Sequence, residues 1–195
     1  MIQSPLATYE EFSTQGNKSI PEYIKFEVIK ALSFFPELQN THIIFQLSNK
    51  TEKSIMKTRV SLTSLFLNVS KRTYVVVISN NFHLQDKKIE MSYIPKDVLV
   101  GWIGVELGKI LAYETASNYQ VLSYLFSSHF SKKFVKKKEL KANRCARRRM
   151  KAFVVAARKF ILNKSDLPNQ VIEKVNKMYT SPAFIVNFIN THSSV

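Results

Sequence analysis

Three charged residues stand where the sequence predicts the interior of the protein. Glu106 and Lys109 lie at the centre of the most apolar stretch of the chain, which runs from Val98 to Tyr113. Glu139 begins a pattern of three- and four-residue spacing that predicts the inward stripe of a helix; its other members are Asn143, Ala146, Met150, Phe153, Ala157 and Phe160. Because desolvating an unpaired carboxylate is costly, we expect Glu139 to have a partner inside the protein.

The other residue types that could carry chemistry form no recognised site. The four histidines have no spacing typical of a metal pair, and His129, the one that closely precedes Glu139, is interpreted as a loop residue. The single cysteine, Cys145, excludes an intramolecular disulfide and a CxxC metal site, which fits a reducing compartment. There is no GxSxG, Walker A or GxGxxG pattern. With neither a signal peptide nor a transmembrane span apparent, we expect a cytoplasmic protein.

Most of the positive charge lies on one segment. The chain has a net charge of +15, and residues 132–159 hold thirteen Lys or Arg and one acid. This segment is predicted to be a solvated helix face, or a surface that attracts nucleic acid, an anionic membrane or an acidic protein. The candidate polyanion-binding residues are Lys136, Lys137, Lys138, Arg147, Arg148 and Arg149. No recognised nucleic-acid motif accompanies them, and aromatic residues are not interleaved for stacking.

The elements that must position these residues indicate an α+β fold. We predict a loose arm over residues 1–18 and one domain over 19–195, with a helix, a sheet and a second helix up to residue 114 and a helical part over 115–195. The expected elements are helix Pro21–Leu38, strands His42–Leu47, Met56–Asn68 and Thr73–Ser79, a helix from Pro95 to Tyr113 that Asp97 caps, a basic helix Val135–Leu162, and short helices Pro168–Met178 and Pro182–Ile189.

The helix that ends near Tyr113 is unusual because it contains three of the four glycines in the chain, Gly101, Gly104 and Gly108. Each glycine costs about 1 kcal/mol relative to alanine in a helix interior, so something must approach the helix backbone closely. One interpretation is tight packing of the helix against the sheet. The other is a groove that admits an extended peptide, lined by Gly101, Trp102 and Gly104.

The segment from Val105 to Lys109, with the sequence VELGK, resembles the HExxH motif on the active-site helix of zincin metallopeptidases. In that motif two histidines bind zinc and the glutamate activates water. Downstream, Glu139 and Asn143 form an ExxxN pattern similar to the ExxxD of gluzincins, whose glutamate is the third zinc ligand. The layout from about Ala31 onward, including Ser181 and Pro182, is similar to that of a group of bacterial zincin-like proteins.

The resemblance implies that the metal chemistry has been lost. Val105 and Lys109 occupy the positions of the two histidines, and neither a valine nor a charged lysine can bind zinc. Glu106 is retained, but in this mechanism it acts on metal-bound water. The resemblance therefore implies no cofactor and no bound metal. It also places Lys109 near Glu139, so we predict a buried ion pair between them that Glu106 joins; in the alternative, Lys109 reaches solvent.

Three functions remain open from the sequence. The first is a catalytically inactive zincin-like protein that binds or scaffolds a peptide or protein partner in the groove beside Gly101, Trp102 and Gly104. The second is a polyanion-binding protein that uses the basic helix over residues 132–159. The third is an enzyme with unrecognised chemistry, for which the sequence offers no signature.

Overall fold

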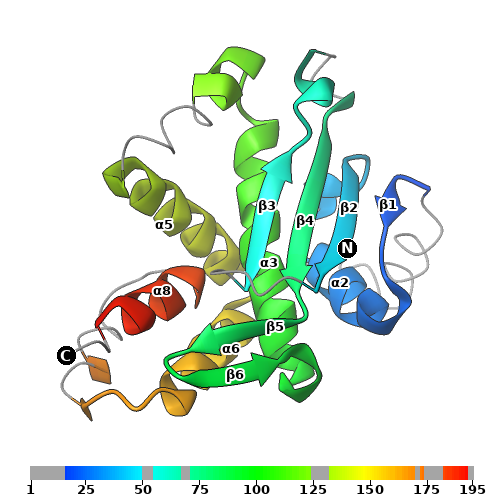
Figure 1. Ribbon diagram of the computed structural model, residues 1–195. Coiled ribbons are helices and arrows are strands. Elements are labelled where there is room, and N and C mark those ends of the chain that lie inside the picture. The colour runs from blue at the N-terminus through cyan, green and yellow to red at the C-terminus, as the bar shows by residue number, and fades with distance from the viewer. Residues whose placement is uncertain are drawn as a thin grey trace.

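The protein is built on a four-stranded sheet with helices packed beside it (Figure 1). The computed structural model describes residues 16–49, 55–66, 71–123, 132–169, 172–173 and 182–192, without the side chains of residues 66, 132–136, 138, 182–184, 187 and 192. The strands are β1 (Lys18–Ser19), β2 (His42–Ser48), β3 (Met56–Val60) and β4 (Thr73–Ser79), and their order is β1-β2-β4-β3. β1, β2 and β4 are parallel, whereas the edge strand β3 runs antiparallel to β4.

One face of the sheet is buried more deeply than the other. In β4 the side chains of Tyr74, Val76 and Ile78 are fully buried, while the residues between them are half-buried. This alternation follows from the two-residue period of a strand, and it confirms the predicted strand Thr73–Ser79. The predicted strand Met56–Asn68 is wrong in its second half, because β3 ends at Val60 and a 3-10 turn, Thr63–Phe66, follows.

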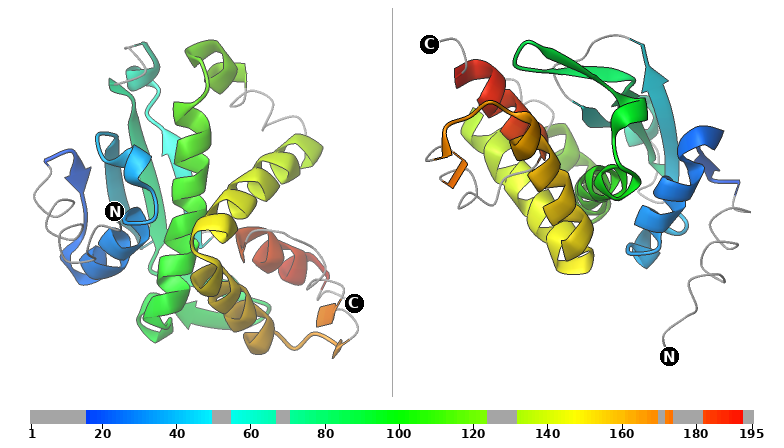
Figure 2. Two further views of the ribbon diagram at one scale, coloured as in Figure 1. Left: turned by 180° about the vertical axis from the view of Figure 1, so that it is seen from behind. Right: turned by 90° about the horizontal axis from the view of Figure 1, so that it is seen from below.

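Helix α3 (Lys96–Glu114) lies at the centre of the molecule (Figure 2). It packs against α2 (Lys25–Leu32) on one side and against α5 (Lys132–Arg149) and α6 (Lys151–Lys164) on the other, and it also contacts β3. All residues from Val98 to Gly108 are buried, as expected for a helix that is apolar on all sides. The α+β class is therefore confirmed. The predicted cap by Asp97 is wrong, because the helix begins one residue earlier and Pro95 occupies the N-cap position.

The first predicted helix is shorter than expected. A 3-10 turn, Glu22–Ile24, leads into α2, which ends at Leu32, and a second 3-10 turn, Pro36–Leu38, follows. A proline disfavours helical backbone geometry at the residue before it, and Pro36 therefore explains the break at Phe35. The loose arm predicted over residues 1–18 also ends early: Lys18 lies in β1, where its ammonium donates hydrogen bonds to the carbonyl oxygens of Gln39 and Thr41 at 2.8 and 2.7 Å.

The predicted basic helix Val135–Leu162 is two helices. α5 ends at Arg149, and α6 begins at Lys151 after Met150, whose φ of −138° and ψ of 53° interrupt the helical geometry. The inward stripe is nevertheless present: Asn143, Ala146, Met150 and Ala157 are buried. Breaking the helix at Met150 lets both halves pack along α3. Of the two predicted C-terminal helices, Pro168–Met178 lies mostly outside the described residues, and the other is α8 (Pro182–His192).

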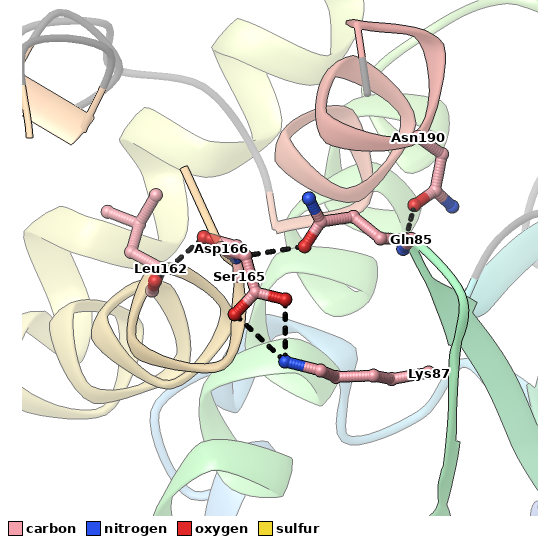
Figure 3. A network of polar contacts seen from close by, with 6 residues as sticks. All are labelled: Gln85, Lys87, Leu162, Ser165, Asp166 and Asn190. Atoms are coloured by element: carbon pink, nitrogen blue, oxygen red, sulfur yellow. Dashed lines mark hydrogen bonds and ion pairs between the residues drawn. The ribbon is translucent and has the colours of Figure 1, made fainter. Parts of the chain in front are cut away.

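A hairpin that was not predicted follows β4 directly. β5 (Asn81–Leu84) and β6 (Lys87–Glu90) pair across a two-residue turn in which Gln85 has a φ of 57°. A network of polar contacts holds this turn against the C-terminal helices (Figure 3). The side-chain oxygen Oδ1 of Asn190, on α8, accepts a hydrogen bond from the backbone N–H of Gln85 at 2.7 Å. The Lys87 ammonium forms an ion pair with the Asp166 carboxylate at 2.7 Å. The hairpin therefore connects the sheet to α8 and to the segment that follows α6.

Candidate functional site

Three charged side chains contact one another between α3 and α5. They belong to Glu106, Lys109 and Glu139, and we call these three residues the ion cluster. The Lys109 ammonium lies 2.8 Å from Glu106 Oε1 and 2.6 Å from Glu139 Oε1. The side chains of Lys109, Glu106 and Glu139 are 16%, 4% and 21% exposed. The predicted ion pair is therefore present, and the alternative in which Lys109 reaches solvent is wrong. Because Glu139 is on α5 and the other two residues are on α3, the cluster connects two helices.

A residue that the sequence did not indicate completes the ion cluster. Thr58, on the edge strand β3, donates to Glu106 Oε2 from its backbone N–H at 3.0 Å and from its hydroxyl at 2.7 Å. Both oxygens of Glu106 are thus bound, one by Thr58 and one by Lys109. Thr58 lies 48 residues from Glu106, and its role depends on how β3 lies against α3, so no local pattern could have predicted it.

The charges of the ion cluster shift the pKa values of its members in ways that burial and proximity explain. Burial alone would lower the pKa of the Lys109 ammonium, but the two carboxylates outweigh it and raise that pKa above its ordinary value. Burial raises the pKa of the Glu106 carboxyl; Lys109 opposes this shift and Glu139 adds to it. Two carboxylates thus share one ammonium, which gives a net charge of −1 when all three residues are ionised.

This shift predicts a pH dependence of stability. Because folded Glu106 binds its proton more tightly than the unfolded chain does, the free energy of unfolding should fall as the pH rises above about 4.3, and should level off above the raised pKa. The variant Glu106→Gln should lose this part of the pH dependence of the free energy of unfolding. Chemical denaturation of both proteins across the acidic and neutral range measures it, and parallel pH profiles for the two proteins would contradict the assignment to Glu106.

The residues of the ion cluster do not fit a zinc ion. Val105 is buried one turn before Lys109 and has no donor atom, and the Lys109 ammonium lies between the carboxylates, where it would repel a dication. Among the residues that the structure describes, no three His, Cys, Asp or Glu side chains gather as metal ligands do. Asn143 is buried on α5 one turn after Glu139, so it shares the inward face of that helix.

The groove predicted at Gly101, Trp102 and Gly104 is filled. A Cβ atom on Gly101 would overlap the backbone of Phe153, and one on Gly104 would overlap the side chain of Met150. Trp102 is buried and meets the rings of Phe82 and Phe160 edge-on, with centroid distances of 5.8 and 6.0 Å. The groove prediction is therefore wrong at these positions, and close packing explains the glycines. The packing partners are α5 and α6 rather than the sheet.

The candidate polyanion-binding residues do not share one surface, because three consecutive residues of a helix point in three directions about 100° apart. Arg149 forms an ion pair with Glu37 at 2.7 Å and donates to the carbonyl oxygen of Phe34, and Arg147 is half-buried. Lys137 and Arg148 are exposed, whereas the side chains of Lys136 and Lys138 lie outside the described residues. Arg149 thus has a structural role, which corrects its assignment to a polyanion site.

The exposed charge of α5 follows a different set of residues. Where the side chains of α5 are described, those classed as exposed are Lys137, Lys141, Arg144 and Arg148. We call these four residues the α5 basic stripe. Lys141 and Arg144 were not among the predicted residues because they lie outside the runs of three basic residues, although the spacing of four, three and four residues from Lys137 to Arg148 was a usable signal.

Among the described helices, none combines the length and the apolar composition that crossing a lipid bilayer requires. No known family model, no curated protein and no solved structure matches this chain.

Proposed function

We propose that this chain is a zincin-like protein in which the ion cluster takes the place of a zinc ion, and that it acts as a non-catalytic binding or scaffold module. The observation that carries the proposal is the position of the Lys109 ammonium between Glu106 and Glu139. Lys109 and Glu139 match the second and third zinc-ligand positions of the motif that the chain resembles. An ammonium that contacts both carboxylates supplies the positive charge that a metal would otherwise provide.

The contacts of Glu106 are a second argument against hydrolysis. In an HExxH enzyme the corresponding glutamate takes a proton from metal-bound water. Here Glu106 Oε2 accepts two hydrogen bonds from Thr58, and Oε1 accepts one from Lys109. A general base needs a free oxygen within reach of its substrate. Because both oxygens are bound and the side chain is only 4% exposed, Glu106 serves as a structural anchor.

Metal analysis tests this proposal. The wild-type protein, purified without chelators, should contain much less than one zinc per chain. The double variant Val105→His/Lys109→His would restore the two missing imidazoles beside Glu139, so zinc should raise its melting temperature by binding the folded state. Val105→His alone is the matched control, because it keeps the Lys109 ammonium and should not respond to zinc.

Two results would reject the proposal. One is a tightly bound, stoichiometric zinc in the wild-type protein. The other is a double variant that folds, as judged by circular dichroism, yet melts at the same temperature with and without zinc; that result would mean that positions 105, 109 and 139 do not correspond to zinc-ligand positions.

A second candidate function is the binding of polyanions by the α5 basic stripe. The observation that favours it is that all four described side chains exposed on α5 are basic. Heparin, a polyanion without bases, tests this candidate. Its binding should weaken steeply when salt rises from about 50 to about 200 mM, because bound counterions must be displaced.

A further inference from the structure

Helix α5 has two faces of opposite character. Its inner face packs on α3 so closely that a Cβ atom on Gly108 would lie 2.7 Å from the carbonyl oxygen of Ala142. Its outer face carries the α5 basic stripe. At about 100° per residue, the four stripe residues fall within an arc of about 60°. The stripe is therefore a single line of charge along one side of the helix.

No acid on α5 balances this line of charge. The one acidic residue of the helix, Glu139, is turned inward and contacts Lys109 at 2.6 Å. Arg149, whose guanidinium contacts Glu37 at 2.7 Å, lies outside the stripe. The four stripe residues thus present about four unit charges to solvent. Helix α5 itself lies on the side of α3 that is turned away from β1 and α2 (Figure 2).

The surroundings of the stripe favour one class of polyanion. A helix that binds at a membrane interface needs an apolar face for the lipid, but the apolar face of α5 is used against α3. Within the described residues, the large apolar side chains exposed to solvent all lie outside α5; they are Tyr23, Phe26, Ile44, Leu62, Tyr93 and Tyr119. Single-stranded nucleic acid is bound by stacking on aromatic rings, and the stripe has none.

The length of the stripe fits a regular array of phosphates. Lys137 and Arg148 are eleven residues apart, which corresponds to about 16 Å along a helix axis. A duplex carries about one phosphate charge per 1.7 Å of its axis when both strands are counted, so a 16 Å length holds about nine charges and can supply a contact for each of the four stripe residues. We propose that the α5 basic stripe binds the phosphate backbone of double-stranded nucleic acid. This inference rests on the polyanion candidate above and names the partner.

The number of contacts sets the expected salt dependence. Four phosphate contacts give a slope of about −3.6 for the logarithm of the association constant against that of the salt concentration, and therefore about 150-fold weaker binding at 200 mM than at 50 mM salt. Fluorescence anisotropy with a short labelled DNA duplex measures this slope. Two duplexes of unrelated sequence should give the same value, because backbone contacts carry no sequence information.

A pair of matched variants tests the assignment to the stripe. Lys141→Glu/Arg144→Glu removes two of the four contacts and should reduce the slope to about half. The control, Lys57→Glu/Lys88→Glu, makes the same change of net charge at two lysines that are exposed on β3 and β6, and it should keep the wild-type slope. Circular dichroism and thermal melting establish that both variants fold like the wild-type protein.

Four outcomes would overturn this inference, and they differ in what they say about the candidate on which it rests. If heparin binds but the duplex does not, the polyanion candidate stands and the inference of a duplex partner is wrong. Vesicles that contain phosphatidylserine, if bound in preference to the duplex, would identify a membrane surface instead. If none of these polyanions binds, both the candidate and the inference fail. Equal loss of duplex binding in the two double variants would show that net charge matters and the stripe does not.

Discussion

Replacing Lys109 with methionine should lower the free energy of unfolding by roughly 3–5 kcal/mol, the range seen when one partner of a buried ion pair is removed. The substitution keeps most of the side-chain volume and removes the charge, which leaves Glu106 and Glu139 facing each other in a site where the two carboxylates are 4% and 21% exposed. Chemical denaturation measures the loss. A loss below about 0.5 kcal/mol would be typical of a surface pair and would contradict the buried cluster.

Two further variants separate charge from packing. Lys30 on α2 is half-buried, and no carboxylate in the described part of the chain forms an ion pair with it. Lys30→Met therefore makes the same chemical change without that contact, and it should cost much less. The triple variant Lys109→Met/Glu106→Gln/Glu139→Gln removes all three charges, and it should recover much of the stability lost in Lys109→Met, because a neutral cluster has no unpaired charge. If the triple variant is as unstable as the single one, the loss comes from packing.

The ion cluster could be predicted from the sequence because a charge in an apolar segment is a strong signal. Burial of an unpaired ion costs several kcal/mol, so Glu139 on the inward stripe needed a partner, and the resemblance to the zincin motif indicated Lys109 as that partner. The long apolar stretch around Glu106 and Lys109 predicted α3, since a helix that is apolar on all sides must be central. The contribution of Thr58 could not be predicted, because it depends on tertiary contact between β3 and α3.

The hairpin shows where local signals fail. Two-residue hairpin turns favour Asn-Gly or Asp-Gly because their backbone needs positive φ, and this turn has Gln85 and Asp86 instead. The Gln85 conformation is held from a distance: Asn190 accepts a hydrogen bond from its N–H and donates one to the carbonyl oxygen of His83 at 2.8 Å. That support comes from a residue 105 positions away, so the turn has no signature of its own.

The break between α5 and α6 at Met150 also lacks a local signal in the sequence. No glycine or proline interrupts the sequence between α5 and α6, so the continuous three- and four-residue pattern predicts one helix. The residues that face inward are the same whether the helix is continuous or broken. The buried positions Asn143, Ala146, Met150 and Ala157 were therefore predicted correctly, although the single helix was not. In contrast, the early end of α2 did have a local signal, since Pro36 disfavours helical geometry at Phe35.

The three glycines of α3 should respond very differently to replacement by alanine. Helix propensity alone predicts that each substitution stabilises the protein by about 1 kcal/mol. The packing predicts otherwise, because a Cβ atom at Gly101 would overlap backbone atoms of Phe153, and one at Gly108 would lie 2.7 Å from the carbonyl oxygen of Ala142. Backbone cannot move aside without displacing a helix, so Gly101→Ala should cost about 3 kcal/mol or more, and Gly108→Ala somewhat less.

Gly104→Ala is the informative comparison, because the atoms it would meet are the sulfur and methyl group at the end of the Met150 side chain. Methionine is unbranched and can adopt another rotamer, so this variant should lie within about 1 kcal/mol of the wild-type protein. Gly16→Ala, where no atom of the described residues lies within 4 Å of the added Cβ, is the control and should be close to neutral. Chemical denaturation of all four variants gives the order. If Gly101, Gly104 and Gly108 all tolerate alanine equally, α5 and α6 do not approach α3 closely, and the ion cluster, which depends on the same approach of α5, would lose its geometric basis.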